Sequence, residues 1–389
     1  MFSARTTRVL DFRRIGKVRH AGSERARPRR SLTASSISAL GVGLGLSVAD
    51  LPAQSIAVRE QYGGPVTRVR GETFGNPLIF ASPTSIEWIN QRLVIIDRKA
   101  ERMIIVLDGR TGSTVQRFGR RGSGPGEFQG PWELAPASSP NAVWIFDTSL
   151  RRMTLVDLEQ SFESGTFAPR RMVQLSGGTE LNSLRWVADG MLFGTGTLRR
   201  GLFAVFDADG RELPARGDFT HGDRRLPISA LQQAYSARIA TDPRRERIAL
   251  AMTYADRLEF YSTTGRRVGT AQRPVGFEPT FVVAGTGSER RAVFTGESRE
   301  AYEDLDATST SVFALFSGRR PREFKNDAMF ARHVLVFSWV GVLRGVLELD
   351  AAAIAIAVDP EASTLYALVH DPEPRVVRYR LPAFARDTR

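Results

Sequence analysis

The chain has 389 residues, of which 42% belong to the apolar set and 35 are glycines, so it can bury a large core with many tight turns and is neither disordered nor collagen-like. It has no cysteine, which excludes disulfides, thiolate catalysis, Cys-ligated zinc and Fe–S clusters. The formal net charge of +12 is uneven, because residues 1–53 carry +7 and the remainder only +5. The later basic residues are scattered arginines without a basic stripe or binding motif, so we expect no nucleic-acid partner.

Residues 1–53 have the features of a signal peptide with a long basic n-region. An Arg- and Ser-rich segment precedes an apolar run from Ile37 to Ala49, which is shorter than the roughly 20 residues that a membrane span needs. We expect cleavage after Ala53 or after Ala49, a periplasmic or extracellular location, and no membrane span in the mature protein. The alternative is a disordered tail with an apolar patch.

The first repeated unit lies between residues 85 and 118. Four β-branched or aromatic runs, 86–89, 93–97, 103–108 and 114–118, are separated by short gaps such as Asn90-Gln91. Short strands with hairpin-length gaps predict a four-stranded antiparallel meander.

The same unit recurs after a glycine-rich joint, with strands predicted at 132–135, 142–147, 153–157 and 170–175. Asp97 and Asp147 end the second strands 50 residues apart, and Arg102 and Arg152 follow each of them five residues later. This shared register indicates a true repeat. We expect the repeated aspartates and arginines to stabilise turns.

Later copies keep the period, and third-strand markers fall near residues 106, 155, 205, 260, 336 and 378. Six units of about 50 residues with four strands each are typical of a β-propeller. We therefore predict an all-β fold, a six-bladed β-propeller of four-stranded antiparallel blades, as one domain over 54–389. The long interval between 260 and 336 predicts an insertion within about 296–328; a seventh blade hidden there is the alternative.

The last unit shows only three strands, at 353–359, 364–371 and 375–381. Its fourth strand must come from elsewhere, and the candidates are Ser55–Arg59 and Val66–Val69. An N-terminal strand at this place would close the ring and remove an exposed sheet edge.

The glycine-rich segment 119–130 offers the candidate ligand-binding residues Arg121, Glu127 and, just beyond it, Trp132. Backbone N–H groups of such a loop could cradle an anion with help from Arg120 and Arg121. However, the loop precedes no helix and lacks a GK[ST] ending, so a structural crossover between two blades is favoured. Trp132 and Trp88 lie in predicted inner strands, where they could stack on a sugar or peptide or pack between blades.

Two stretches resemble known propellers. The run from Phe118 to Phe128, followed by Pro131, resembles the NHL-repeat consensus, and residues 333–382 are similar to the last blades of exported bacterial six-bladed TolB-like propellers. The resemblance covers roughly residues 75–382. It implies the fold rather than an activity, since such propellers include scaffolds, sugar or peptide binders, lactonases and lyases.

Catalytic and metal-binding signals are weak. Beyond the leader the chain has only His221, His333 and His370, at unrelated positions in the repeat, and it has no compact acidic motif of the EF-hand type. We therefore assign no catalytic residue, no metal ligand and no cofactor, with Ca²⁺ or another divalent cation at the axis as the alternative.

The function predicted from these features is a monomeric, exported binding or interaction module with a protein, peptide or saccharide ligand. The alternative is a propeller enzyme, a metal-dependent lactonase-like hydrolase or lyase with its site in the axial channel.

Overall fold

The computed structural model describes residues 66–75, 80–160, 167, 169–187, 190–198, 200–271, 275–359, 361 and 363–386. The predicted leader 1–53 and the candidate strand Ser55–Arg59 lie outside the described residues. The described part of the chain contains no helix long and apolar enough to cross a membrane.

Four separate sheets, each of four antiparallel strands, follow one another along the chain. Their strands are β3 to β6 (Pro83–Ile89, Arg92–Asp97, Ile104–Asp108, Thr114–Phe118), β7 to β10 (Pro131–Pro136, Ala142–Asp147, Arg152–Asp157, Pro169–Gln174), β11 to β14 (Glu180–Trp186, Leu192–Thr197, Phe203–Phe206, Glu212–Arg216) and β15 to β18 (Ala237–Thr241, Arg247–Met252, Leu258–Ser262, Arg267–Thr270). The predicted strands of the first two units are confirmed. Between β3 and β4 both turn residues, Asn90 and Gln91, have positive φ (39° and 62°), as two-residue hairpins of the type I′ class require.

Eight further strands form one sheet built from two antiparallel sets. Its strands are β21 (Tyr302–Ala307), β22 (Ser311–Phe316), β23 (Ala331–Ser338), β24 (Leu343–Asp359), β25 (Thr364–Val369) and β26 (Arg375–Arg380), with β1 (Val66–Val69) and β2 (Glu72–Thr73) at its edges. The long strand β24 joins the two sets, because it pairs with β23 before residue 353 and with β25 after it.

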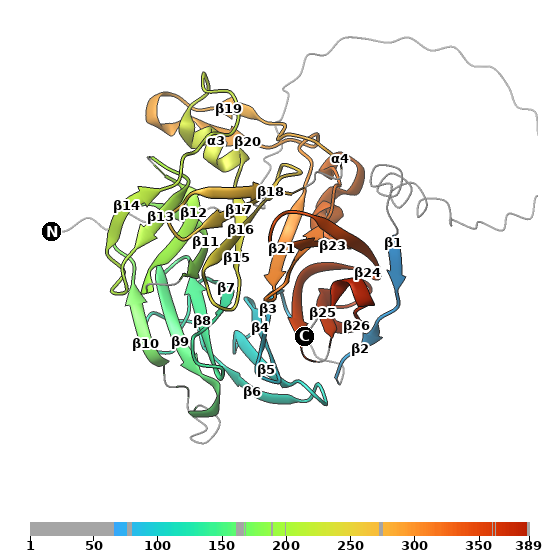
Figure 1. The fold of residues 1–389 in the computed structure, drawn as a ribbon. Coiled ribbons are helices and arrows are strands. Elements are labelled where there is room, and N and C mark those ends of the chain that lie inside the picture. The colour runs from blue at the N-terminus through green and yellow to red at the C-terminus, as the bar shows by residue number, and fades with distance from the viewer. Residues whose placement is uncertain are drawn as a thin grey trace, which may run out of the picture. The chain divides into compact units, whose positions relative to one another are not determined.

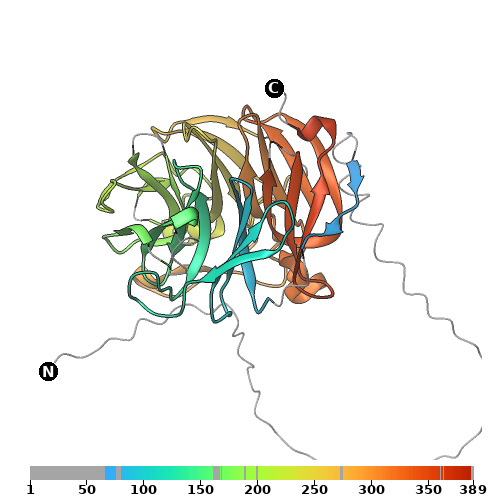
Figure 2. The same ribbon diagram turned by 90° about the horizontal axis from the view of Figure 1, so that it is seen from below.

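The N-terminal strands differ from the closure that the sequence suggested. Val66–Val69 pairs in parallel with residues 346–349 of β24, so it covers the outer edge of the set that precedes the last one. Glu72–Thr73 is the segment that pairs, antiparallel, with β26. Figure 2 shows β1 and β2 in blue beside the orange and red strands.

The first strand of every set lies innermost, and these strands form a closed ring (Figure 1). In the ring β3 contacts β7, β7 contacts β11, β11 contacts β15, β15 contacts β21, β21 contacts β24, and β24 returns to β3. The core consists of apolar clusters between neighbouring sheets, since each cluster combines side chains from two successive sets. This is the architecture of a β-propeller with four-stranded antiparallel blades.

The interval 296–328, where an insertion was predicted, contains β21 and β22 at 302–307 and 311–316. The additional residues lie on either side of these two strands. Residues 271–301 contain the hairpin β19 (Val282–Ala284) and β20 (Arg291–Val293) and a 3-10 turn, Gly287–Glu289, whereas residues 317–330 contain α4 (Pro321–Phe324) and the 3-10 helix Lys325–Met329. The acidic and hydroxyl-rich composition of 296–328 concealed the inner strand β21, whose carboxyl groups are described below, and its neighbour β22.

Two further short elements lie outside the blades. Helix α3 (Ile228–Ala234) contacts β20 and β12, and a last 3-10 turn, Ala383–Ala385, follows β26. Figure 1 shows α3 and the β19–β20 hairpin together at one side of the ring.

Candidate functional site

The glycine-rich loop is held by interactions within itself. The Glu127 carboxylate accepts hydrogen bonds from the Gly124 N–H (2.9 Å) and from Arg120 Nε (2.7 Å). These bonds, that from Gly124 first, lower the pKa of Glu127. Arg152 donates to the carbonyl oxygens of Ser123 (3.0 Å) and Gly124 (3.4 Å). The loop thus turns carbonyl groups toward a buried arginine, which is the contact expected of a structural crossover.

The repeated aspartates fix the crossovers in the same way, as predicted. Asp97 accepts hydrogen bonds from the N–H groups of Ala81 and Ser82, both at 2.7 Å. Asp147 accepts them from Gln129 (2.8 Å) and Gly130 (3.1 Å). Each carboxylate therefore anchors the segment that enters an inner strand.

A shared irregularity shows which side chains of the inner strands occupy equivalent positions. In five of the inner strands the pairing register shifts by one residue near the start, at 83/85, 131/133, 181/183, 302/304 and 353/355. Side chains alternate along a strand, so the first and third residues after this β-bulge point to the same side. The residues between them all belong to the apolar clusters between blades: Ile86, Leu134, Leu184, Leu305 and Ile356.

The opposite side of each inner strand faces the next blade close to the axis, since Ala135 and Ala357 on that side belong to clusters between blades, and it carries two layers of residues. The first layer is Ser85, Glu133, Ser183, Asp304 and Ala355, and the second is Glu87, Ala135, Arg185, Asp306 and Ala357. Strand β15 has no bulge, and its core residue Ile239 leaves Arg238 and Ala240 on the axial side. We call the ionisable members the axial cluster: Glu87, Glu133, Arg185, Arg238, Asp304 and Asp306.

One ion pair in the axial cluster is fully satisfied. Arg185 Nη1 lies 2.8 Å from Glu133 Oε1, and both side chains are less than 10% exposed. Glu133 also accepts hydrogen bonds from Ser183 Oγ (2.6 Å) and from the Leu184 N–H (2.9 Å). This pair links β7 to β11, so it contributes to the ring itself.

Asp304 and Asp306 join β21 to β24, and both have raised pKa values. Their carboxylates accept the N–H groups of Ile356 (2.8 Å) and Val358 (2.6 Å). Burial raises the pKa of Asp304 to about 7 and that of Asp306 to about 6, although these hydrogen bonds act in the opposite direction. Both side chains remain partly exposed, so solvent reaches them.

Three glutamates add further carboxyl groups with raised pKa values. Burial, followed by repulsion from Asp306, raises the pKa of Glu87 well above its ordinary value. Burial and the nearby Glu300 do the same for Glu303, and burial raises the pKa of Glu300 to about 7. Glu303 occupies the bulge of β21, is 8% exposed, and has no hydrogen-bond partner for its Oε1 within the described residues.

Trp132 lies in the bulge of β7, at the same end of the axis as Glu303. Its ring is flanked by two guanidinium groups, with Arg98 Cζ at 5.1 Å and Arg238 Cζ at 5.3 Å from the ring centroid, and its Nε1 donates to the carbonyl of Asn182 at 3.1 Å. Arg238 Nε in turn donates to the carbonyl of Glu303 at 3.2 Å. The structure thus brings Trp132 to the axial cluster, whereas Arg121 and Glu127 lie in the loop that leads into β7. Trp88 instead stacks on Tyr366, with centroids 5.2 Å apart.

No group of three or more His, Asp or Glu side chains in the described part of the chain is placed to hold a metal ion. His221 pairs with Glu259 at 2.9 Å, and both side chains are buried. Burial lowers the pKa of His333 to about 4 and that of His370 as well. The three histidines lie in separate places and do not form one site.

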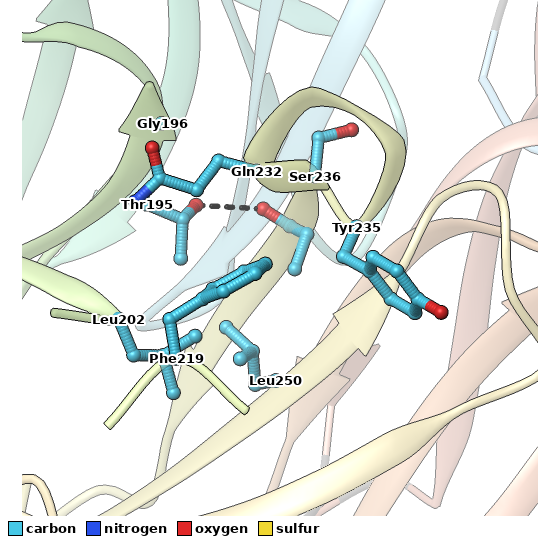
Figure 3. A pocket seen from close by; sticks show the side chains of 9 residues that line it. Thr195, Gly196, Leu202, Phe219, Gln232, Tyr235, Ser236 and Leu250 are labelled. Atoms are coloured by element: carbon cyan, nitrogen blue, oxygen red, sulfur yellow. Dashed lines mark hydrogen bonds between the residues drawn. The ribbon is translucent and has the colours of Figure 1, made fainter. Parts of the chain in front are cut away.

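Two hollows lie away from the axis. A cavity of about 10 Å³ between β12, α3 and β16 is lined by Thr195, Phe219, Gln232, Tyr235 and Leu250 among others (Figure 3). This volume is at the limit for one water molecule, so the cavity is a packing defect. A surface groove of about 450 Å³ lies between the β15–β16 and β21–β22 turns, where Arg247 pairs with Asp242 at 3.0 Å.

Comparisons with known proteins agree with this architecture. The family model described as TolB-like 6-blade propeller-like matches residues 66–361. The chain therefore belongs to this TolB-like propeller family. No curated protein sequence matches it.

Several solved structures are similar to this chain at low sequence identity. A member of the DUF4221 family from Bacteroides vulgatus is similar with a TM-score of 0.52 and 10% identity, over 81% of this chain and 96% of that chain. The RRP9 WD40 repeats give a TM-score of 0.48 at 10% identity, over 80% and 100%. BamB from Moraxella catarrhalis gives 0.37 at 14% identity, over 80% and 74%. These likenesses concern the fold alone.

Proposed function

We propose that this chain is an exported six-bladed propeller that works as a monomeric binding module, with its ligand surface at the axis. The six inner strands and the family described as six-bladed support counting the two sets of the eight-stranded sheet as the fifth and sixth blades. In this interpretation β2 closes the sixth blade through its pairing with β26. The leader features of residues 1–53 support export.

The convergence of carboxyl groups at the axis is the observation that carries this proposal. Six carboxyl groups gather there (Glu87, Glu133, Glu300, Glu303, Asp304, Asp306), and two arginines, Arg185 and Arg238, lie among them. Burying carboxyl groups without matching cations lowers stability. Small residues such as Ala135 and Ala357, which other inner strands have at the same positions, would fill this space without burying a charge. Titratable groups with such perturbed pKa values concentrate at functional sites.

The three candidate residues have different places in this proposal. Trp132 offers an aromatic surface beside the axial cluster and is only partly buried. Arg121 and Glu127 lie at the same end of β7 and would contact the outer part of a ligand. We assign the ligand as a protein, peptide or saccharide.

Two measurements test the proposal. A fusion of residues 1–53 to a reporter that is active only after export should be active outside the cytoplasm, and a cytoplasmic reporter would contradict export. Peptide and glycan arrays probed with residues 54–389 should give binding that W132A weakens and M172A, a change at an exposed side chain on the outer strand β10, leaves intact. Binding that is indifferent to W132A would place the ligand surface elsewhere.

The alternative function is a lactonase-like hydrolase or lyase. Asp304 favours it, because a partly exposed carboxyl group with a pKa near 7 suits general acid–base catalysis. Lactone hydrolysis by residues 54–389, with and without added Ca²⁺, distinguishes the two functions. Turnover that D304N abolishes would establish the enzyme.

A further inference from the structure

We propose that the axial cluster binds a guanidinium group, the side chain of an arginine in a peptide partner. This inference rests on the proposed binding function and specifies its ligand.

The acidic side of the axis carries more carboxyl groups than guanidinium groups. Glu133 is matched by Arg185, whereas Arg238 is the second arginine among Glu87, Glu303, Asp304 and Asp306. Arg238 contacts a backbone carbonyl and the face of Trp132. The remaining carboxyl groups therefore favour a positively charged ligand.

An independent observation points to the same place. Glu303 Oε1 is buried and has no hydrogen-bond partner within the described residues. Thr84 Oγ1, which lies in the equivalent bulge of β3, is buried and unpartnered in the same way. Buried oxygen atoms without donors lower the stability of the folded protein, and an N–H donor of a ligand at the axis would satisfy Glu303 Oε1.

The arrangement of side chains favours a guanidinium over a metal ion. Among the described residues, no group of three or more His, Asp or Glu side chains is placed to hold a metal ion. A guanidinium spreads five N–H donors over a planar fork and can bond several separate carboxyl groups.

The axis already contains an example of this chemistry. Arg185 makes its 2.8 Å ion pair with Glu133 in the same ring, on neighbouring strands. The flanking of Trp132 by Arg98 and Arg238 shows that its ring accepts guanidinium groups as neighbours. An incoming arginine would meet carboxylates of the same type and an aromatic edge at the same end of the axis.

The test measures binding of four probes to residues 54–389 by calorimetry at pH 8. The probes are acetyl-Gly-Arg-Gly-amide, its citrulline and lysine analogues, and CaCl₂ alone. Citrulline has nearly the shape of arginine without its charge, so we expect the arginine peptide to bind at least about tenfold more tightly than the citrulline peptide, the loss expected for one hydrogen bond to a charged group. We expect the lysine peptide to bind more weakly than the arginine peptide.

The variants D304N and E303Q should each weaken arginine-peptide binding at least about tenfold, again by the loss of one hydrogen bond to a charged group. The matched control D209N removes a carboxylate whose side chain is 78% exposed and pairs with Arg171 on an outer strand, and it should bind as the wild type does. Circular dichroism and the melting temperature of each variant establish that it is folded.

Four results would overturn the inference: no binding of the arginine peptide, equal binding of the citrulline or lysine peptide, unchanged affinity in D304N and E303Q, or Ca²⁺ binding that both variants abolish. An array ligand that depends on Trp132 but is not displaced by the arginine peptide would also overturn it, while leaving the proposed binding function intact.

Discussion

Replacing Asp304 with asparagine should make the folded protein more stable at pH 8. The amide keeps an oxygen that can accept the Ile356 N–H, which the carboxylate accepts at 2.8 Å. It removes a negative charge from a site where burial raises the pKa from 3.8 to about 7. The substitution therefore relieves an electrostatic cost while the neighbouring hydrogen bond persists.

The magnitude follows from proton linkage. Folded Asp304 holds its proton to a higher pH than the unfolded chain does, so its contribution to stability falls as pH rises from about 4 to about 7. A shift of about three pKa units corresponds to at most ~4 kcal/mol. Asp304 is partly exposed to solvent, which reduces the expected effect to ~2 kcal/mol.

The assay is urea unfolding of residues 54–389, wild type and D304N, at pH 5 and at pH 8. The difference in unfolding free energy between variant and wild type should grow by ~1 kcal/mol in favour of the variant between the two pH values, because about two of the three pKa units lie above pH 5. The control D209N should show no such change. A difference that stays constant with pH, or a variant less stable than the wild type at pH 8, would refute the reasoning.

Three further predictions concern stability. Gly126 has φ of +76°, and a Cβ there would lie 2.2 Å from the Phe167 ring. The variant G126A should therefore lower the unfolding free energy by more than ~1 kcal/mol, whereas G178A, with open space around it, should lower it much less. Equal losses in thermal unfolding would contradict the crossover role. R152A should lower the unfolding free energy by ~2 kcal/mol, because it removes the buried guanidinium that donates to the carbonyls of Ser123 and Gly124. R120A removes a side chain that is 70% exposed and should lower it by under ~1 kcal/mol. The reverse order in urea unfolding would be inconsistent with the structure. Burial lowers the pKa of His333 to about 4, so its contribution to stability is lost as pH falls from about 6.5 to about 4; in H333F the melting temperature should depend less on pH in this window, and an unchanged slope would show that another group titrates.

The blades with apolar second and third strands could be predicted from the sequence. The shared register of Asp97 and Asp147 gave the first two sets, and both residues anchor the crossovers. The strands β11, β12 and β15 were not predicted, because polar residues such as Asn182 and Arg238 and glycines such as Gly194 interrupt their apolar pattern. Strands that mix core residues with polar residues near the axis have an apolar pattern that appears weak in the sequence.

The axial cluster was missed for a related reason. Its members come from five strands far apart in the chain, and only the shared β-bulge shows that they occupy equivalent positions. A usable signal existed in Glu87 and Glu133, each an acidic residue inside an otherwise apolar predicted strand. The acidic run of β21 was instead interpreted as part of an insertion, although its acids face the axis and its intervening Leu305 faces the core. Trp132 was the one predicted site residue that the structure brings to this cluster.

The measurement that tests the central claim most directly is a crystal structure of residues 54–389 soaked with the arginine peptide. The account predicts guanidinium density at the axis within hydrogen-bond distance of Asp304 and Glu303, beside Trp132, in a ring of six blades closed by β2. An axis that stays empty of the peptide, or that holds a metal ion coordinated by these carboxylates, would contradict it.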